Sequence, residues 1–291
     1  MFPKSYLDNL INPSYWSRSS CGEERLVKHV EFIEKHSKIV LKNTPHELNV
    51  PYGTESREIL NIVGTDLPDG SPIFIHLHGG YWQKQVVRSE NGIFIAKNLY
   101  SKGIKCIFVG YELCPKVTLD KLCLNVEIAL KKCLEYAKKH ATINSGIYLS
   151  GHSAGAQLIT MLFKSFIPSL SRKDQALFKT AFLITGVYDV PAVLQTNLND
   201  LLHLDQQAAE NASPLHQDLK NTGCHMVVVT AKFDSPKLIQ QGEDMYKYFK
   251  EKGFSAEFIF LEDLDHFDAI ERLYNKESEL IKNIVKCCTT K

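Results

Sequence analysis

The sequence predicts an α/β fold in which a mostly parallel, eight-stranded sheet carries helices on both faces and a small cap region. Short apolar, β-branched runs alternate with longer helical patterns along the chain. The central runs at 73–77 and 226–229 are almost continuously apolar, which is typical of strands buried on both faces. No repeat, low-complexity tract or Pro/Gly/Ser-rich linker interrupts the pattern, so we expect one domain over residues 1–291.

The predicted strands are residues 47–51, 58–63, 73–78, 105–111, 146–150, 180–185, 225–231 and 256–261. Residues 119–140 have apolar side chains at helical spacing, and residues 23–41 predict a helix within an N-terminal extension of about 45 residues (1–45). Ser235-Pro236 is a typical helix start. The segment 187–221, between the sixth and seventh predicted strands, is too long to be a plain connection, so it is a candidate cap over an active site.

The composition excludes several classes of protein. The net charge is +1, 23% of the residues are charged, and no block of like charge predicts a nucleic-acid or membrane partner. No signal peptide or membrane-spanning run is visible, so we expect a cytoplasmic protein that acts on a small molecule. The 8 cysteines include no Cys-x-x-Cys and the 11 histidines are dispersed, so we expect reduced thiols, no metal and no cofactor. The sequence leaves open whether the protein forms a homodimer.

The pattern Gly-x-Ser-x-Gly occurs at residues 151–155, with Ser153 at its centre. It directly follows a predicted strand and directly precedes a helical run at 156–166, the context in which a nucleophilic serine is exposed on a sharp turn. Gly151 and Gly155 give room for close packing, and the helix N-terminus favours negative charge nearby. The context favours Ser153 as the nucleophile of a serine hydrolase over a structural turn.

A second motif, His-Gly-Gly-Tyr-Trp at residues 78–82, follows the third predicted strand, where such hydrolases keep their oxyanion loop. We expect backbone N–H groups of this loop to bind the oxyanion together with that of Ala154; the loop residues concerned are Gly79, Gly80 and Tyr81. Each donor can contribute about 3 kcal/mol of transition-state stabilisation. The alternative is a tight turn after a buried strand.

The other two members of a serine triad should follow in the order acid, then histidine. Asp234 comes after the seventh predicted strand and His266 after the eighth, at the edge of the sheet where α/β proteins gather their active sites. His266 would take the proton of Ser153, and Asp234 would orient the imidazole ring. Three other carboxylates are alternatives for the acid: Asp189, Asp263 and Asp265.

Other histidines have different expected places. His152 should point away from Ser153 in a regular turn, and His78 should brace the oxyanion loop. Lone histidines such as His29 and His140 are expected to be exposed to solvent.

These motifs resemble the arylformamidases, or kynurenine formamidases, which are related to the hormone-sensitive-lipase-like esterases of the α/β-hydrolase fold. The resemblance runs through most of the chain and includes residues 12–16, 78–82, 111–115, 151–156, 186–189, 212–215 and 266–268. Its most specific part is the Tyr-Trp end of the oxyanion loop combined with Asn-Pro-Ser-Tyr-Trp at 12–16. Tyr81 stands where the wider esterase family has a third glycine.

The resemblance implies hydrolysis of N-formyl-L-kynurenine to L-kynurenine and formate, in tryptophan degradation, with Ser153, Asp234 and His266 as the triad. An arylamine leaves more readily than an alkylamine, so such a triad needs no metal assistance. Three aromatic residues could line a substrate pocket or equally belong to the core: Tyr81, Trp82 and Tyr188. The alternatives are a general carboxylesterase for short acyl or aryl esters and a non-catalytic binding module of the same fold.

Overall fold

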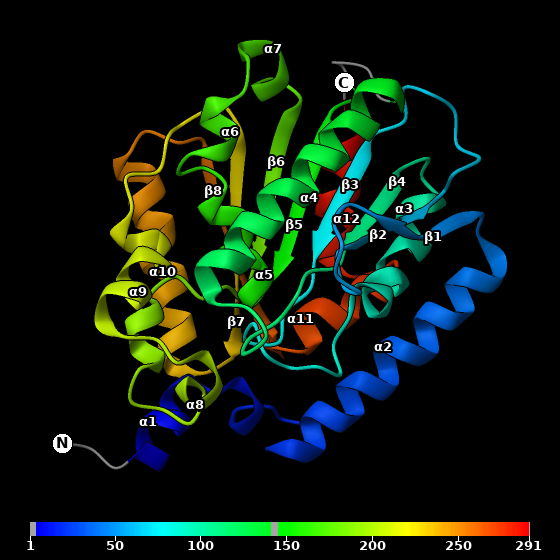
Figure 1. Cartoon of the computed structure of the whole chain (residues 1–291). Coiled ribbons are helices and arrows are strands. Elements are labelled where there is room, and N and C mark those ends of the chain that lie inside the picture. Colours follow the sequence, from blue (N-terminus) through cyan, green and yellow to red (C-terminus); the bar gives the residue numbers. More distant parts are fainter. Residues whose placement is uncertain (1–3, 141–144, 291) are drawn as a thin grey trace.

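The computed structural model describes residues 4–140 and 145–290, and its framework is one eight-stranded sheet (Figure 1). The strand order is β1-β2-β4-β3-β5-β6-β7-β8; β1 pairs with β2 and β2 with β4 in antiparallel fashion, and the other neighbours are parallel. The strands are β1 (His46–Pro51), β2 (Ile59–Val63), β3 (Ile73–Leu77), β4 (Lys105–Val109), β5 (Ile147–His152), β6 (Phe178–Ile184), β7 (His225–Phe233) and β8 (Ala256–Asp265). The predicted mostly parallel sheet of eight strands is confirmed.

The longer helices also match the sequence pattern. α4 occupies the predicted residues 119–140, and α2 begins at the predicted Glu23 and ends at Asn43. The helices are α1 (Lys4–Ile11), α2 (Glu23–Asn43), α3 (Ala96–Tyr100), α4 (Leu119–His140), α5 (Ala154–Met161), α6 (Phe166–Ser169), α7 (Arg172–Gln175), α8 (Asn199–Leu202), α9 (Gln206–Asn211), α10 (Pro236–Glu251), α11 (Asp268–Glu271) and α12 (Glu279–Thr289). Among the described residues, no helix combines the length and apolar character needed to cross a lipid bilayer.

The helical run predicted at 156–166 is shorter than expected. α5 ends at Met161, and the chain turns before α6. Residues 1–3 of the predicted N-terminal extension lie outside the described residues.

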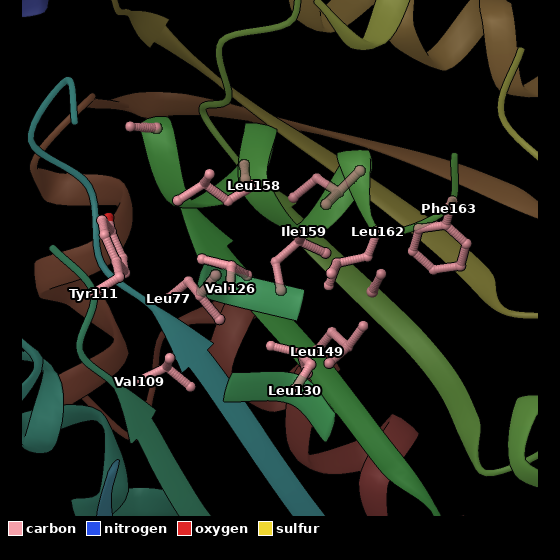
Figure 2. Close-up of a cluster of buried hydrophobic side chains, with 14 of the residues drawn as sticks. Leu77, Val109, Tyr111, Val126, Leu130, Leu149, Leu158, Ile159, Leu162 and Phe163 are labelled. Atoms are coloured by element: carbon pink, nitrogen blue, oxygen red, sulfur yellow. The ribbon is translucent and has the colours of Figure 1, made fainter. Parts of the chain in front are cut away.

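Helices cover both faces of the sheet, as predicted. α4, α5 and α10 share one hydrophobic cluster with one face of the sheet. α2, α3 and α12 share a second cluster with the opposite face. Figure 2 shows part of the first cluster, in which Leu77 of β3 and Leu149 of β5 lie together with Val126 of α4 and Ile159 of α5. Because the side chains of β3 and β5 are buried on both faces of the sheet, these two strands are closely packed up to their carboxyl ends.

The N-terminal segment folds onto the carboxyl edge of the parallel strands. Figure 1 shows α1 and the start of α2, in blue, at the same end of the molecule as α8 and α11. The carbonyl oxygen of Ile11 accepts hydrogen bonds from Tyr81 Oη at 2.7 Å and from Ser235 Oγ at 3.0 Å. The segment is therefore attached to the loops that follow β3 and β7.

Candidate active site

Ser153 lies on a sharp turn between β5 and α5. Its backbone has φ 56° and ψ −120°, a left-handed conformation that non-glycine residues rarely adopt. A Cβ atom on Gly151 would lie 2.3 Å from the carbonyl oxygen of Gly155, and one on Gly155 would lie 2.2 Å from that of Leu77. Only glycine fits at either position, which is the physical reason for the Gly-x-Ser-x-Gly pattern.

The loop after β3 abuts this turn. A Cβ atom on Gly79 would lie 3.0 Å from the Cβ atom of Ser153. Gly80, Tyr81 and Trp82 all have positive φ, at 108°, 46° and 59°. In the described part of the chain, the backbone N–H groups of Gly80 and Tyr81 have no backbone acceptor, so they are available to a ligand.

Side chains hold this unusual loop in place. The indole N–H of Trp82 donates to Gln157 Oε1 at 3.0 Å, and Tyr81 Oη donates to the carbonyl of Ile11. His78 stacks on Tyr111 with 4.2 Å between ring centroids, and its Nδ1 lies 2.8 Å from the carbonyl oxygen of Gly79. Burial lowers the pKa of His78 to about 4, so the ring is neutral near pH 7.

Asp234 is the carboxylate that contacts His266. Asp234 follows β7, His266 follows β8, and His266 Nδ1 lies 2.7 Å from Asp234 Oδ2 with both side chains buried. The other oxygen of Asp234 accepts the backbone N–H of Ser235 at 2.6 Å. Two of the alternative acids have other partners: Asp189 pairs with His216 and Asp265 with Arg25.

A cavity of about 400 Å³ opens onto these groups, a size that suits a small-molecule substrate. Five of the predicted site residues line this cavity: Ser153, His266, Gly79, Gly80 and Tyr81. The N-terminal segment supplies a further group of lining residues: Asn12, Pro13, Ser14, Tyr15, Gly22, Glu23, Leu26 and His29. The predicted cap, residues 187–221, contributes Leu198. The N-terminal segment thus covers more of the cavity than the predicted cap does.

Two of the three aromatic residues predicted for the substrate pocket lie elsewhere. Trp82 and Tyr188 are fully buried, and neither lines the cavity. The backbone turn at Trp82 directs its indole ring towards α5, and the backbone N–H of Tyr188 donates to Gln241 of α10. Both residues are part of the core, whereas Tyr81 reaches the cavity.

The prediction that His29 is exposed is wrong. His29 is buried, its Nδ1 lies 2.8 Å from Glu271 Oε1, and it lines the cavity. Helical spacing in α2 could have revealed this, because His29 shares the buried stripe of Ile33 and Val40. His140, in contrast, is partly exposed and pairs with Asp69.

His152 lines the cavity, and its side chain contacts His266. Its ring packs against that of His266 at a centroid distance of 4.7 Å, and its Nε2 lies 3.0 Å from the carbonyl oxygen of His266. Burial first, and then the nearby His266, lower the pKa of His152, so it is neutral near pH 7. Across residues 4–140 and 145–290, no three His, Cys, Asp or Glu side chains are grouped as a metal site.

Comparisons with known proteins agree with this architecture. A family model described as the alpha/beta hydrolase fold matches residues 74–268. The fold is similar to that of an esterase from Pyrobaculum calidifontis, with 20% identity, a TM-score of 0.67 and coverage of 89% of this chain and 91% of that one. It is also similar to an arylesterase, with 18% identity, a TM-score of 0.65 and coverage of 88% and 90%.

Sequence relatives extend over nearly the whole chain. A kynurenine formamidase from Salmo salar is 32% identical over 97% of this chain and 96% of its own length. A kynurenine formamidase from Danio rerio is 31% identical, also over 97% and 96%. The aligned length includes the N-terminal segment that covers the cavity as well as the sheet and the Ser153 turn. The chain therefore belongs to the kynurenine formamidase family of the α/β-hydrolase fold.

Proposed function

We propose that this protein hydrolyses N-formyl-L-kynurenine to L-kynurenine and formate, with Ser153 as the nucleophile. The observation that carries the proposal is the nearly full-length similarity to kynurenine formamidases of Salmo salar and Danio rerio. The cavity supports it, because Ser153 and His266 line the same space and Asp234 contacts His266. Residues 1–291 then form one cytosolic hydrolase domain, with residues 187–221 as a partial cap.

In the first half of the reaction, the hydroxyl of Ser153 attacks the formyl carbon while His266 takes its proton. Asp234, hydrogen-bonded to the opposite ring nitrogen, stabilises the imidazolium that forms. The oxygen of the former carbonyl becomes negative and is bound by backbone N–H groups of Gly80 or Tyr81 together with that of Ala154. These donors are fixed before the substrate arrives, so little reorganisation accompanies the reaction.

In the second half, the carbon–nitrogen bond breaks and His266 donates its proton to the arylamine nitrogen, releasing kynurenine. The enzyme then carries a formyl ester on Ser153. A water molecule, deprotonated by His266, attacks this ester and releases formate and the free serine. The leaving amine is attached to an aromatic ring that delocalises its lone pair, so the triad suffices for this amide.

Charged groups at the cavity suit the amino-acid end of the substrate. Lys84 and Glu23 both line the cavity, and within the described residues no ion pair involves either of them. Lys84 lies next to the oxyanion loop, since its backbone N–H donates to the carbonyl of Gly80 at 2.9 Å. We assign Lys84 to the α-carboxylate and Glu23 to the α-ammonium group of the substrate, with Tyr15, Leu26 and Phe267 as apolar surroundings of the ring.

The direct test is formate release from N-formyl-L-kynurenine by the intact protein and by Ser153→Ala. We expect the variant to lose about 10⁴-fold or more in kcat/KM. A fluorophosphonate probe should label the intact protein and not the variant. Retained activity in Ser153→Ala would contradict the assigned nucleophile. If a short aryl ester is a good substrate and the formamide is hardly cleaved, the substrate assignment is wrong while the hydrolase mechanism stands.

A further inference from the structure

We infer that Arg25, at the start of α2, is a positioning residue for His266, so that the N-terminal segment (residues 11–29) is a working part of the hydrolase. The inference rests on the proposed function in one respect, since it takes Ser153 and His266 as the reacting pair. It concerns a residue that makes no contact with the reacting atoms and acts through the loop that carries His266.

Arg25 is almost completely buried, with 3% of its side chain exposed, and it contacts the chain on both sides of His266. Its guanidinium lies 3.4 Å from Asp265 Oδ1, 3.5 Å from Asp268 Oδ1 and 2.9 Å from Glu271 Oε1. The same guanidinium carbon lies 4.6 Å from the ring centroid of Phe267. One cation therefore binds the residue before His266, the two residues after it and the end of α11.

Asp265 turns these contacts into a fixed backbone shape. Its Oδ1 accepts the backbone N–H of Phe267 at 2.9 Å and that of Asp268 at 2.7 Å, which closes a turn around His266. Its Oδ2 accepts the hydroxyl of Ser17, and that hydroxyl in turn accepts Arg25 Nε at 3.0 Å. The N-terminal segment thus holds both oxygens of the carboxylate that shapes the loop.

The charges of this cluster depend on Arg25. Burial works to raise the pKa of Asp265, but bonds from Ser17, the backbone of Asp268 and Arg25 outweigh it and lower that pKa. Burial and the charge of Asp265 raise the pKa of Asp268. Without the guanidinium, three carboxylates would face one another in a largely buried space, where an unpaired charge is strongly unfavourable. The loop would have to rearrange or take up protons.

Rearrangement of this loop would move His266 relative to Ser153. The His266 ring is fixed by Asp234 through Nδ1, and its carbonyl oxygen by Nε2 of His152, but its backbone follows the turn closed by Asp265. A displacement of about 1 Å between reacting groups can lower a rate about 100-fold. We therefore expect Arg25 to affect the rate of the chemical step more than substrate binding.

The N-terminal segment also contacts the other two catalytic loops. The carbonyl oxygen of Ile11 accepts one hydrogen bond from Tyr81 Oη of the oxyanion loop and another from Ser235 Oγ. Ser235 directly follows Asp234 in the chain. His29, one helical turn after Arg25, shares Glu271 with it. One segment of the chain is therefore bonded to the loops that carry the oxyanion donors, the acid and the histidine.

The test compares Arg25→Met and Arg25→Ala with the intact protein in kcat, KM, rate of labelling by a fluorophosphonate, and melting temperature. We expect kcat and the labelling rate to fall about 30- to 100-fold, with KM changed by less than about threefold. Methylguanidinium at millimolar concentration should restore part of the labelling rate of Arg25→Ala and none of that of Arg25→Met, whose side chain still fills the space. An equal concentration of NaCl should have no effect.

Lys105→Met is the matched control. Lys105 is also almost completely buried and pairs with Asp69 at 3.9 Å, but it begins β4 at the opposite edge of the sheet. This variant should lose stability and keep its kcat within about twofold. If Arg25→Met and Arg25→Ala resemble Lys105→Met, with a lower melting temperature and unchanged kcat and labelling rate, Arg25 is only structural and the inference is overturned.

Two provisions keep the test decisive. If the Arg25 variants do not fold, Ser17→Ala replaces them, because it removes a hydrogen bond to Asp265 and leaves the ion pairs of Arg25. The labelling rate of Ser17→Ala should fall about three- to tenfold. An unchanged labelling rate overturns the inference. Labelling requires Ser153 and His266 but no formamide. Failure of the proposed substrate therefore leaves this measurement valid, and the two failures can be told apart.

Discussion

At the scale of single residues, three of the six non-glycine residues with positive φ in the described chain lie where the chemistry is proposed. Tyr81, Trp82 and Ser153 have positive φ, and each such residue costs about 1–3 kcal/mol. Neighbouring contacts offset the cost: the phenol of Tyr81 binds the carbonyl of Ile11, and the indole of Trp82 binds Gln157. Tyr81 therefore occupies a left-handed position that a third glycine would fill without strain, and it uses its side chain to hold the N-terminal segment.

The charge on Lys84 gives a prediction about substrate recognition. Replacing Lys84 with Met should raise KM for N-formyl-L-kynurenine about five- to tenfold, because the α-carboxylate loses its ion-pair partner. The kcat should change little, since Lys84 contacts no reacting atom in the proposed mechanism. Steady-state kinetics with N-formyl-L-kynurenine and with a neutral phenyl ester would measure both effects.

The ester is the discriminating substrate because it has no carboxylate, so Lys84→Met should leave its KM unchanged. Lys138→Met is the control variant, since Lys138 pairs with Asp174 away from the cavity. Equal increases of KM for both substrates would mean that Lys84 shapes the cavity without binding the carboxylate.

At the scale of elements, α2 shows what periodicity can and cannot predict. The helix and its apolar stripe follow from Ile33 and Val40, and the same spacing places Arg25 and His29 on the buried side. Their partners could not be predicted, because Asp265 and Glu271 lie about 240 residues further along the chain. Sequence periodicity identifies which side of a helix is buried, but the identity of the surface it meets depends on the tertiary fold.

The start of α10 gives a prediction about stability. Ser235 Oγ caps the helix by accepting the backbone N–H of Leu238 at 3.4 Å, and it also donates to the carbonyl of Ile11. Ser235→Ala should therefore lower the free energy of unfolding by about 1–2 kcal/mol, through loss of a helix cap and of a buried hydrogen bond. Urea denaturation followed by circular dichroism would measure the change.

Ser171→Ala is the control for this effect. Ser171 caps the exposed four-residue helix α7 in the same way, accepting the backbone N–H of Asp174 at 3.2 Å, but it holds no distant segment. Its replacement should cost less than Ser235→Ala. Equal costs would indicate that the bond from Ser235 to Ile11 adds nothing to stability.

At the scale of the whole molecule, local patterns predict the sheet and the loops at its carboxyl edge, but not what covers them. The eight strands, the Ser153 turn and the contact between Asp234 and His266 follow from short motifs read in chain order. The cover over the cavity does not, because residues 12–29 are held there by contacts with Asp265 and Glu271, which lie about 240 residues further along the chain. Length alone pointed to residues 187–221, which contribute Leu198 to the cavity.

The dependence of stability on pH is a property of the whole molecule, and four of the five buried histidines in the described residues govern it: His29, His76, His78 and His152. Burial is the main cause that lowers the pKa of each, to about 3 for His76 and about 4 for His78. The unfolded chain binds protons at these sites near the ordinary value of about 6.5. Between pH 6.5 and 4 the unfolded state therefore holds more protons, and stability falls as the pH falls.

Each of these histidines can remove up to about 1.4 kcal/mol of unfolding free energy per pH unit in that window. The carboxylate of Asp265 also makes stability fall as the pH falls, but it does so at a lower pH. Its pKa is held below the ordinary 3.8, so its contribution to stability is lost only below about pH 3.8. Urea denaturation at pH 7.5, 6.0 and 5.0 should show a steep loss below pH 6.5. His76→Gln should make it shallower, and replacement of the partly exposed His140 should not. A free energy of unfolding that is constant from pH 7.5 to 5.0 would contradict this prediction. It would mean that burial does not penalise protonation of these histidines in the folded protein.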